Sequence, residues 1–409
     1  MRSRKNDLVT ARQVEDLASS ILQRSLQWVD VGTKCTVVVV LRVLFFAAAR
    51  TASIFDACRH LADAPCDQAV RNALFGWLGS DMPELERRLN RALRAKLPKG
   101  LFGRRRRWPM AVDTSDIAYY GRPWRRTREL RRGKRKAGTT RFHCYGTLYV
   151  VAHGQRFTVA LTYVWKDDTN LTTLVRLMRY AAQIGLHPRY LLLDRGFYSL
   201  PVVQYLQAAR YAFLMPVIHR GKKSKRPLAQ LRGTRRFLAW KRAGWATHVM
   251  DNRKTRRSVR VCVSFPRRQG QSRQRRKRRR RRERPLVYIY WGFQPPSPAW
   301  VREHYRRRYG IESSYRQMNQ ARARTCSRKP VLRLLLVGIA LVLRNVWVWL
   351  HHQMLGRIRG RSIELHLEQL RLRTMLLMLQ HGIEACVGCS ESRHPPEIPP
   401  LGSTTGPPV

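Results

Sequence analysis

The stretch from residue 108 to residue 218 constrains the fold most, because apolar strand-like runs and helical segments follow one another there in a fixed order. The strand-like runs are 110–113, 142–152, 155–165, 190–193 and 211–218. Segments with helical periodicity, 171–184 and 200–209, separate the last three strands. Strands joined by a short turn pair antiparallel, whereas strands joined through a helix pair parallel. We therefore predict an α/β fold built on a mixed sheet.

The rest of the chain divides by composition around this sheet. Residues 1–100 show helical spacing of apolar residues, which predicts an all-helical N-terminal domain. Within it, residues 53–74 have the outline of either a DNA-binding helix-turn-helix or a plain helical hairpin. Residues 219–297 combine basic loops with short apolar runs such as 237–240, so we predict a β-rich insertion.

Helical periodicity returns after the insertion and continues almost to the end of the chain. The expected helices are 301–324, 331–350 and 357–379, the last within a group of C-terminal helices spanning 351–390. The final segment, 391–409, is rich in Pro, Gly and Ser, which predicts a disordered tail.

The charge of the chain points to a polyanionic partner. Lys and Arg number 81 against 25 Asp and Glu, a formal net charge of +56, yet 44% of the residues are hydrophobic. That hydrophobic content is too high for a disordered polycation, and the composition excludes collagen-like and mucin-like chains. Basic runs at 104–107, 122–138 and 273–284 are suited to nucleic acid.

No segment predicts a membrane or secretory role. The first residues are basic but lack the apolar stretch of a signal peptide. The apolar runs 37–41 and 334–343 are shorter than the roughly 20 residues that span a bilayer. We expect a cytoplasmic, nucleoid-associated protein with no membrane partner.

Two carboxylates are predicted at the ends of buried strands. Asp113 follows Met110-Ala111-Val112, and Asp194 follows Tyr190-Leu191-Leu192-Leu193. A carboxylate in such a place is costly unless it has a partner or a cation, and ligands bind at strand ends in sheets of this kind. Two such acids together with a third would hold a pair of divalent metal ions. Taken singly, either Asp is an ordinary cap or loop residue.

The third acid is Glu312, on the helix predicted over 301–324. Tyr305, Arg308 and Glu312 are spaced i, i+3, i+7, so they share one helical face. The plainer interpretation is that Glu312 forms salt bridges with Arg308 or Arg316, four residues to either side.

Two further acids compete for the catalytic positions. Asp116 lies three residues beyond the expected strand end, which suits a cap or turn. Asp168 fits an N-cap for the helix that follows it.

These motifs, in this order, resemble the DDE transposases of bacterial insertion sequences, in the group marked by a Y-x2-R-x3-E-x6-K signature. Asp113 corresponds to the first Asp of the family, and Asp194, in Asp194-Arg195-Gly196-Phe197-Tyr198, to the second. Tyr305, Arg308 and Glu312 fill the first three signature positions, but Asn319 stands where the family has Lys. That departure puts the contact of the Lys with the terminal DNA phosphate in doubt, and Arg316 or Arg322 are the available substitutes.

The resemblance implies a ribonuclease-H-like catalytic domain formed by 108–218 and 298–350, with 219–297 as its insertion. It implies metal-dependent strand cleavage at transposon ends and strand transfer into target DNA. Asp113, Asp194 and Glu312 would bind two Mg²⁺ or Mn²⁺ ions. The partners would be double-stranded DNA, as transposon ends and as target, and a second copy of the protein when two ends are paired.

The expected DNA contacts come from the signature helix and from a basic loop. Tyr305 and Arg308 would position the scissile or terminal phosphate, and Arg316 would add a further contact. Trp124, beside Arg125 and Arg126, either stacks on an unpaired base or packs in the core.

Two other functions remain open. One is a catalytically inactive or domesticated transposase that acts as a DNA-binding protein. The other is a ribonuclease-H-like nuclease without strand transfer, which would share the same site.

Overall fold

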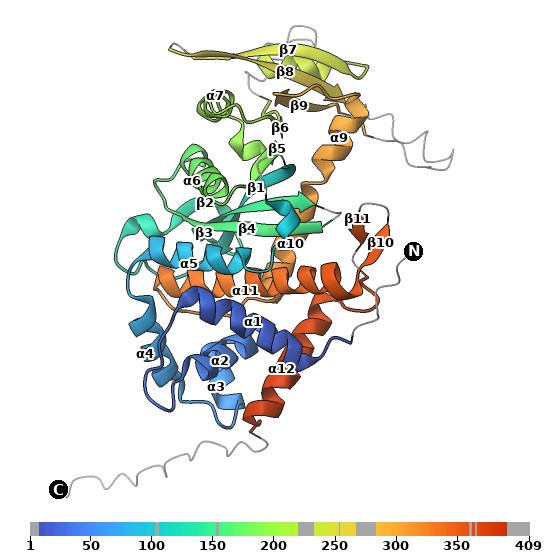
Figure 1. The fold of residues 1–409 in the computed structure, drawn as a ribbon. Helices are drawn as coiled ribbons and strands as arrows, with labels where there is room; N and C mark the ends of the chain where they lie inside the picture. Colours follow the sequence, from blue (N-terminus) through green and yellow to red (C-terminus); the bar gives the residue numbers. More distant parts are fainter. Residues whose placement is uncertain are drawn as a thin grey trace, which may run out of the picture.

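The computed structural model describes residues 8–102, 106–152, 155–219, 233–252, 254–266, 284–359, 362–364 and 366–390. At 152, 309–312, 357–359 and 362–364 it describes the backbone alone. A central sheet lies above a helical region built from both ends of the chain (Figure 1).

Within the described residues the central sheet has nine strands and is mixed, as predicted. Along the sheet the strands are β2 (Arg131–Lys136), β3 (Thr139–Ala152), β1 (Arg107–Ala118), β5 (His187–Leu193), β6 (Phe213–Pro216), β9 (Leu286–Trp291), β8 (Arg256–Ser264) and β7 (Gly244–Asp251), while β4 (Gln155–Val164) pairs with β3. Strand β1 pairs antiparallel with β3 and parallel with β5. Helices α6 (Asn170–Gln183) and α7 (Leu200–Ala208) make the crossovers between the parallel strands. The predicted mixed α/β fold is therefore confirmed.

Two details of the first strands differ from the prediction. Strand β1 continues to Ala118, so Asp113 lies within the strand and not at its end. The basic loop expected at 122–138 contains β2, whose hairpin with β3 turns at Ala137 and Gly138, with φ of 49° and 80°. Lys and Arg have low strand propensity, but an exposed edge strand tolerates them and is protected by them from further pairing.

The described parts of the segment 219–297 continue the central sheet. Strand β9 pairs antiparallel with β6, and β8 and β7 follow it outward. The prediction of a strand at 237–240 is wrong, because Gly233–Ala239 forms a 3₁₀ helix. Strand β7 was not predicted from the sequence. The basic segment 273–284 lies outside the described residues except for Arg284.

The N-terminal region is helical, as predicted. It consists of α1 (Ala11–Leu26), α2 (Val37–Arg50), α3 (Ile54–His60), α4 (Asp67–Leu78) and α5 (Met82–Arg94). These helices pack with the buried α11 (Pro330–Leu350) and with α12 (Leu372–Val387), so that the two ends of the chain share one core (Figure 1). The helix expected over 357–379 is wrong in its first half, where Arg357–Arg359 and Ser362–Glu364 form the hairpin β10–β11.

In the part of the chain that the structure describes, one helical segment, Pro330–Leu355, is long and apolar enough to cross a membrane. Its apolar window is completely buried inside the fold, which is typical of a core helix. The bent pair α2 and α3 meets the same criterion only when it is counted as one span.

Side chains from α5 and α11 take the place of a neighbouring strand along β4. Asn90 accepts from the Leu161 N–H at 2.7 Å and donates to the Leu161 carbonyl at 3.0 Å. Asn345 pairs in the same way with Thr158, at 3.1 and 2.7 Å. Glu86 accepts from the Tyr163 N–H at 2.7 Å. These hydrogen bonds satisfy outward backbone groups of β4 at Thr158, Leu161 and Tyr163, which joins the helical region to the sheet.

Glu86 makes the stability of this contact between the helices and β4 dependent on pH. Burial raises the pKa of Glu86 to about 7, although the Tyr163 N–H and the Thr162 hydroxyl favour its charged form. Between pH 4.5 and about 7 the unfolded chain is ionised at this position while the folded protein keeps its proton. The free energy of unfolding therefore falls as pH rises through this window.

We expect Glu86→Gln to remove this pH dependence. Above pH 7 the variant should be more stable than the wild type by about 2 kcal/mol, because Gln keeps the acceptor for Tyr163 without the buried charge. Urea unfolding at pH 5 and pH 8 measures the effect, with the exposed Glu303→Gln as the control. Equal pH dependence in wild type and Glu86→Gln would contradict the assignment.

Candidate active site

The pairing of β1 with β5 brings the two predicted aspartates together. Val112 pairs with Leu193 in parallel register, so Asp113 and Asp194 follow as the next residues on neighbouring strands. Strand β5 ends there, and the chain turns into the short 3₁₀ helix Arg195–Phe197. The two carboxylates therefore lie beside each other at the carboxyl end of β5, near the surface of the protein.

A single guanidinium joins the two carboxylates. Arg308 Nη1 donates to Asp113 Oδ2 at 3.1 Å, and Nη2 lies 3.2 Å from Asp194 Oδ1. The Arg308 side chain is 6% exposed, against 13% for Asp113 and 42% for Asp194. Arg308 and Asp113 are thus buried, whereas the carboxylate of Asp194 is open to solvent.

Tyr305 fixes the position of the guanidinium. Arg308 Nε donates to the Tyr305 hydroxyl at 2.9 Å, and that hydroxyl donates to the Leu193 carbonyl at 3.3 Å. Burial raises the pKa of Tyr305, so the phenol stays protonated. Burial alone would lower the pKa of Arg308, but Tyr305, Asp113 and Asp194 raise it, and the guanidinium remains charged.

Tyr305 and Arg308 do not belong to one continuous helix. The predicted helix 301–324 is broken into α9 (Pro298–Arg306) and α10 (Tyr309–Gln320), and Arg308 is the residue that precedes α10. At the break the N–H groups of Arg307 and Arg308 donate to carbonyls three residues back, as in a 3₁₀ turn, which interrupts the α-helical pattern. The i, i+3 spacing still places Tyr305 and Arg308 on the same side.

Glu312 belongs to α10, but the structure describes only its backbone. Among the described residues, no group of three or more His, Cys, Asp or Glu forms a metal site. The described donors nevertheless fit a divalent ion. Asp113 and Asp194 already share one cation, and carboxylate oxygens are the ligands that Mg²⁺ and Mn²⁺ prefer.

The competing acids are engaged elsewhere. Asp168 accepts from the Trp165 N–H at 2.8 Å and forms an ion pair with Arg176, and the N-cap of α6 is Thr169 instead. Asp116 lies an odd number of residues from Asp113 on β1, hence on the opposite face of the strand. Its carboxylate contacts the thiol of Cys144.

The sequence did not reveal the contact that anchors α10 beside Asp113. Thr147 lies opposite Asp113 on β3, and its hydroxyl is 2.6 Å from the hydroxyl of Tyr315 on α10. Burial raises the pKa of Tyr315, which keeps this hydroxyl protonated. Only the pairing of β1 with β3 identifies these residues, since neither belongs to a local motif.

The expected DNA-contacting residues occupy two places. Arg316 is exposed on α10, as is Asn319, whose side-chain oxygen accepts from Arg322 at 3.4 Å. Trp124 lies in the loop between β1 and β2, with the exposed Arg125 guanidinium 4.1 Å from its ring centre.

That loop is organised by one buried acid. Glu129 accepts hydrogen bonds from the backbone N–H groups of Trp124, Arg125 and Arg126, at 2.7, 3.1 and 3.2 Å. Its carboxylate is thereby used internally, and the Arg125 and Arg126 side chains remain exposed.

Comparisons with known proteins agree with this architecture. A family model described as the transposase DDE domain matches residues 105–346, more than half of the chain. Among solved structures, the cryo-EM structure of the piggyBac transposase synaptic complex with hairpin DNA is similar, with a TM-score of 0.53 and 10% sequence identity. The alignment covers 93% of this chain and 81% of that one, and at this identity it indicates a shared fold. No curated protein matches the sequence. The chain belongs to the transposase DDE domain family.

Proposed function

We propose that this protein is an active DNA transposase, which cleaves strands at transposon ends and transfers them into target DNA. Membership of the DDE domain family supports transposase function. The observation that carries the proposal is the meeting of Asp113 and Asp194 at one guanidinium, 3.1 and 3.2 Å away. Two carboxylates brought together in this way repel each other unless a cation lies between them, which suits a site that binds cations.

Asp113 and Asp194 would hold Mg²⁺ or Mn²⁺, and Glu312 would provide a third carboxylate on the strength of the resemblance. When bound, a pair of such ions activates the attacking hydroxyl and stabilises the leaving oxygen. Arg308 would donate its planar fork to phosphate oxygens, a geometry that guanidinium matches well. Tyr305 orients Arg308 through its bond to Nε.

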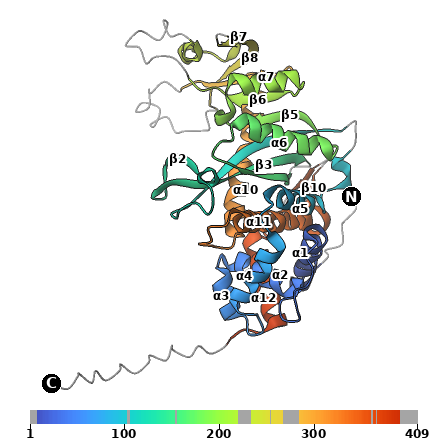
Figure 2. The ribbon, with the colours of Figure 1, turned by 90° about the vertical axis from the view of Figure 1, so that its left-hand side faces the viewer.

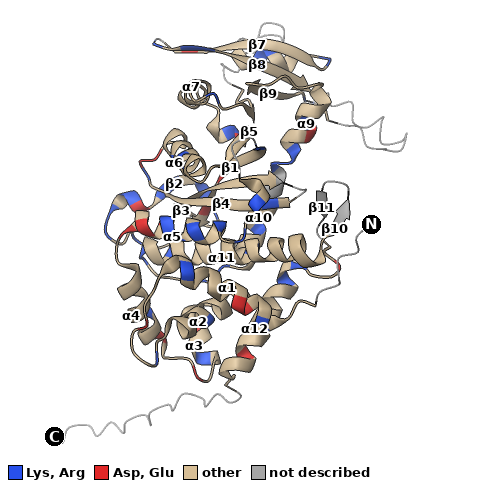
Figure 3. Cartoon of the chain, in the orientation of Figure 1, with Lys and Arg blue, Asp and Glu red and all other residues tan. Residues whose placement is uncertain are grey.

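The basic arm, residues 122–141, is the surface we propose for duplex DNA. Its hairpin projects from the body of the protein (Figure 2), and Arg132, Lys134, Arg135 and Lys136 are exposed on it. Lys and Arg far outnumber acids over the whole ribbon (Figure 3). From Asp113 to Ala118 strand β1 spans about 17 Å, less than one turn of DNA. A duplex with a phosphate at the acids therefore reaches the arm.

Neutralising the arm should weaken DNA binding and reduce its salt dependence. For Lys134→Gln/Arg135→Gln/Lys136→Gln, we expect the slope of log affinity against log salt to fall by about 0.9 for each phosphate that the arm no longer neutralises. Fluorescence anisotropy over a salt series measures the slope. The control removes the same charge from the exposed positions Arg12, Arg24 and Arg87. Equal slopes for both variants would show that the arm is not the DNA surface.

The proposal is tested with a labelled duplex that contains the DNA flanking the gene. We expect strand cuts at one defined position with Mg²⁺ or Mn²⁺, none with EDTA, and joining of the cut 3′ end to a second duplex. Cutting without joining would favour the nuclease alternative.

One observation favours the alternative of an inactive, DNA-binding transposase. Asn319, where the family signature has Lys, is exposed and paired with Arg322. Tight DNA binding without cleavage in either metal would support that alternative. Cleavage by Asn319→Lys alone would then identify the cause.

A further inference from the structure

Arg308 occupies the place between two carboxylates that a shared cation would take. Its Nη1 and Nη2 contact Asp113 and Asp194 separately, through one oxygen of each. We propose that Arg308 is an internal counter-cation that competes with the divalent ion for these carboxylates, and that binding of a DNA phosphate releases it. The inference rests on the proposed function and adds a coupling between DNA and metal binding.

The contacts have the character of a built site. The guanidinium is buried, with 6% of the side chain exposed, and Tyr305 holds its third nitrogen at 2.9 Å. Its planar fork lets one side chain bind two separate carboxylates. Without a cation, Asp113 and Asp194 would repel each other beside the carboxyl end of β5.

Arg308 and a divalent ion would compete because both would bind oxygens of the same two carboxylates. Asp113 Oδ2 and Asp194 Oδ1 face Arg308, and they belong to the same carboxylates that would ligate the metal. A guanidinium cannot give up its charge at ordinary pH, so a divalent ion bound beside it would be repelled. Metal binding through these two oxygens therefore requires that Arg308 withdraw from at least one carboxylate.

A DNA phosphate provides the alternative partner. Phosphate oxygens accept the same pair of N–H donors that the two aspartates accept here. Once Arg308 pairs with phosphate, both carboxylates become available to the metal, so each ligand raises the affinity for the other. The site would then acquire its metal mainly when a DNA strand is in place.

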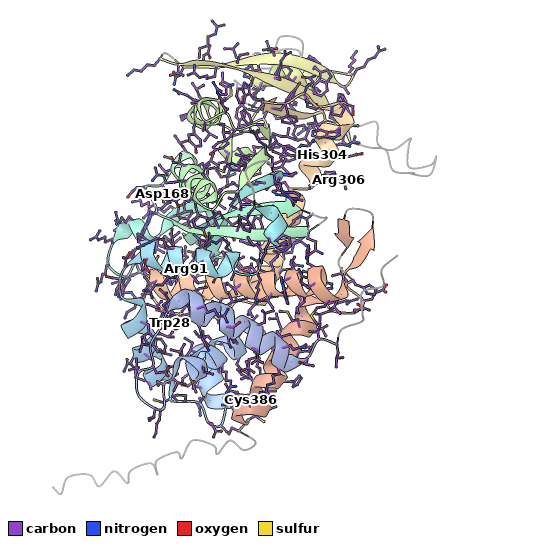
Figure 4. All side chains as sticks on the ribbon, viewed as in Figure 1. Trp28, Arg91, Asp168, His304, Arg306 and Cys386 are labelled. Carbon is purple, nitrogen blue, oxygen red and sulfur yellow. The ribbon has the colours of Figure 1, made fainter. Side chains whose placement is uncertain are left out.

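Mn²⁺ binding without DNA, followed by electron paramagnetic resonance, tests the proposal. We expect Arg308→Gln to bind Mn²⁺ about tenfold more tightly than the wild type, within the usual range of coupling between sites. Arg308→Lys, which keeps the charge but not the fork, should lie between them. The control is Arg306→Gln, the same charge change at an exposed position on α9 (Figure 4).

The second arm of the experiment uses the wild type itself. A short duplex with the flanking DNA sequence should raise its Mn²⁺ affinity by a similar factor, and this gain should vanish in Arg308→Gln. The wild-type measurement requires only folded wild-type protein, and Arg308→Lys, in which the gain should be reduced, provides the comparison when the Gln variant fails to fold.

The outcomes separate the two proposals. Mn²⁺ affinity in Arg308→Gln no higher than in the wild type, or a wild-type affinity unchanged by DNA, would overturn the competition while cleavage still upheld the transposase. Absence of both Mn²⁺ binding and cleavage in every variant would instead overturn the proposed function.

Discussion

Replacing Asp113 or Asp194 with Asn is expected to reduce strand cleavage by about 10³-fold or more, with little change in DNA affinity. Asn preserves the size of the side chain and one oxygen but removes the charge that balances a divalent ion. Asp113 and Asp194 both face the Arg308 guanidinium, so each substitution removes one of the two described carboxylates of the site. Under the proposed function, affinity for DNA comes from basic residues elsewhere, so it should persist.

The matched control for this prediction is Asp116→Asn. It lies on the same strand, three residues from Asp113, and faces the other way toward Cys144. Cleavage of an end-labelled duplex, anisotropy with the same DNA, and a thermal melt separate chemistry from binding and folding. Retained cleavage in Asp113→Asn, together with a loss in Asp116→Asn, would move the site to the other face of β1.

The sequence predicts the core of the site because its signals are local. Apolar runs followed by Asp113 and Asp194 mark two strands, and an intervening helix implies that parallel strands can lie side by side. The i, i+3 spacing of Tyr305 and Arg308 likewise places them on one side, even though the helix is broken at that point. Local patterns were enough to bring together the two aspartates and the Arg–Tyr pair.

The remaining features depend on contacts between distant parts of the chain. Strand β2 is almost entirely basic and strand β7 mixes apolar with polar residues, so neither shows a clear strand pattern in the sequence, and each forms by pairing with a hairpin partner. The double contact of Arg308 requires both the β1–β5 register and the position of α9. No spacing in the sequence encodes the strand register or the position of α9, since Arg308 and its partner Asp113 are 195 residues apart.

The contact of helices α5 and α11 with strand β4 is the clearest example of such a distant contact. Asn345 lies in a segment that reads simply as an apolar helix, and a buried Asn there has no evident purpose in the sequence. In the structure its amide accepts from the Thr158 N–H and donates to the carbonyls of Thr158 and Leu93. One side chain thus joins α11, β4 and the end of α5.

Asn345→Leu is therefore expected to lower the free energy of unfolding by about 4 kcal/mol, since it leaves the Thr158 N–H and carbonyl unpaired in the core. This is a large share of the roughly 5–15 kcal/mol that stabilises a typical domain. Guanidinium unfolding measures the loss, with the exposed Asn72→Leu on α4 expected to change stability by less than about 0.5 kcal/mol. An equally small loss for Asn345→Leu would mean that β4 satisfies its outer edge without α11. A large loss in a single cooperative transition would show instead that the N-terminal helices and the sheet bearing Asp113 unfold together, so that the helical region is part of the scaffold of the active site.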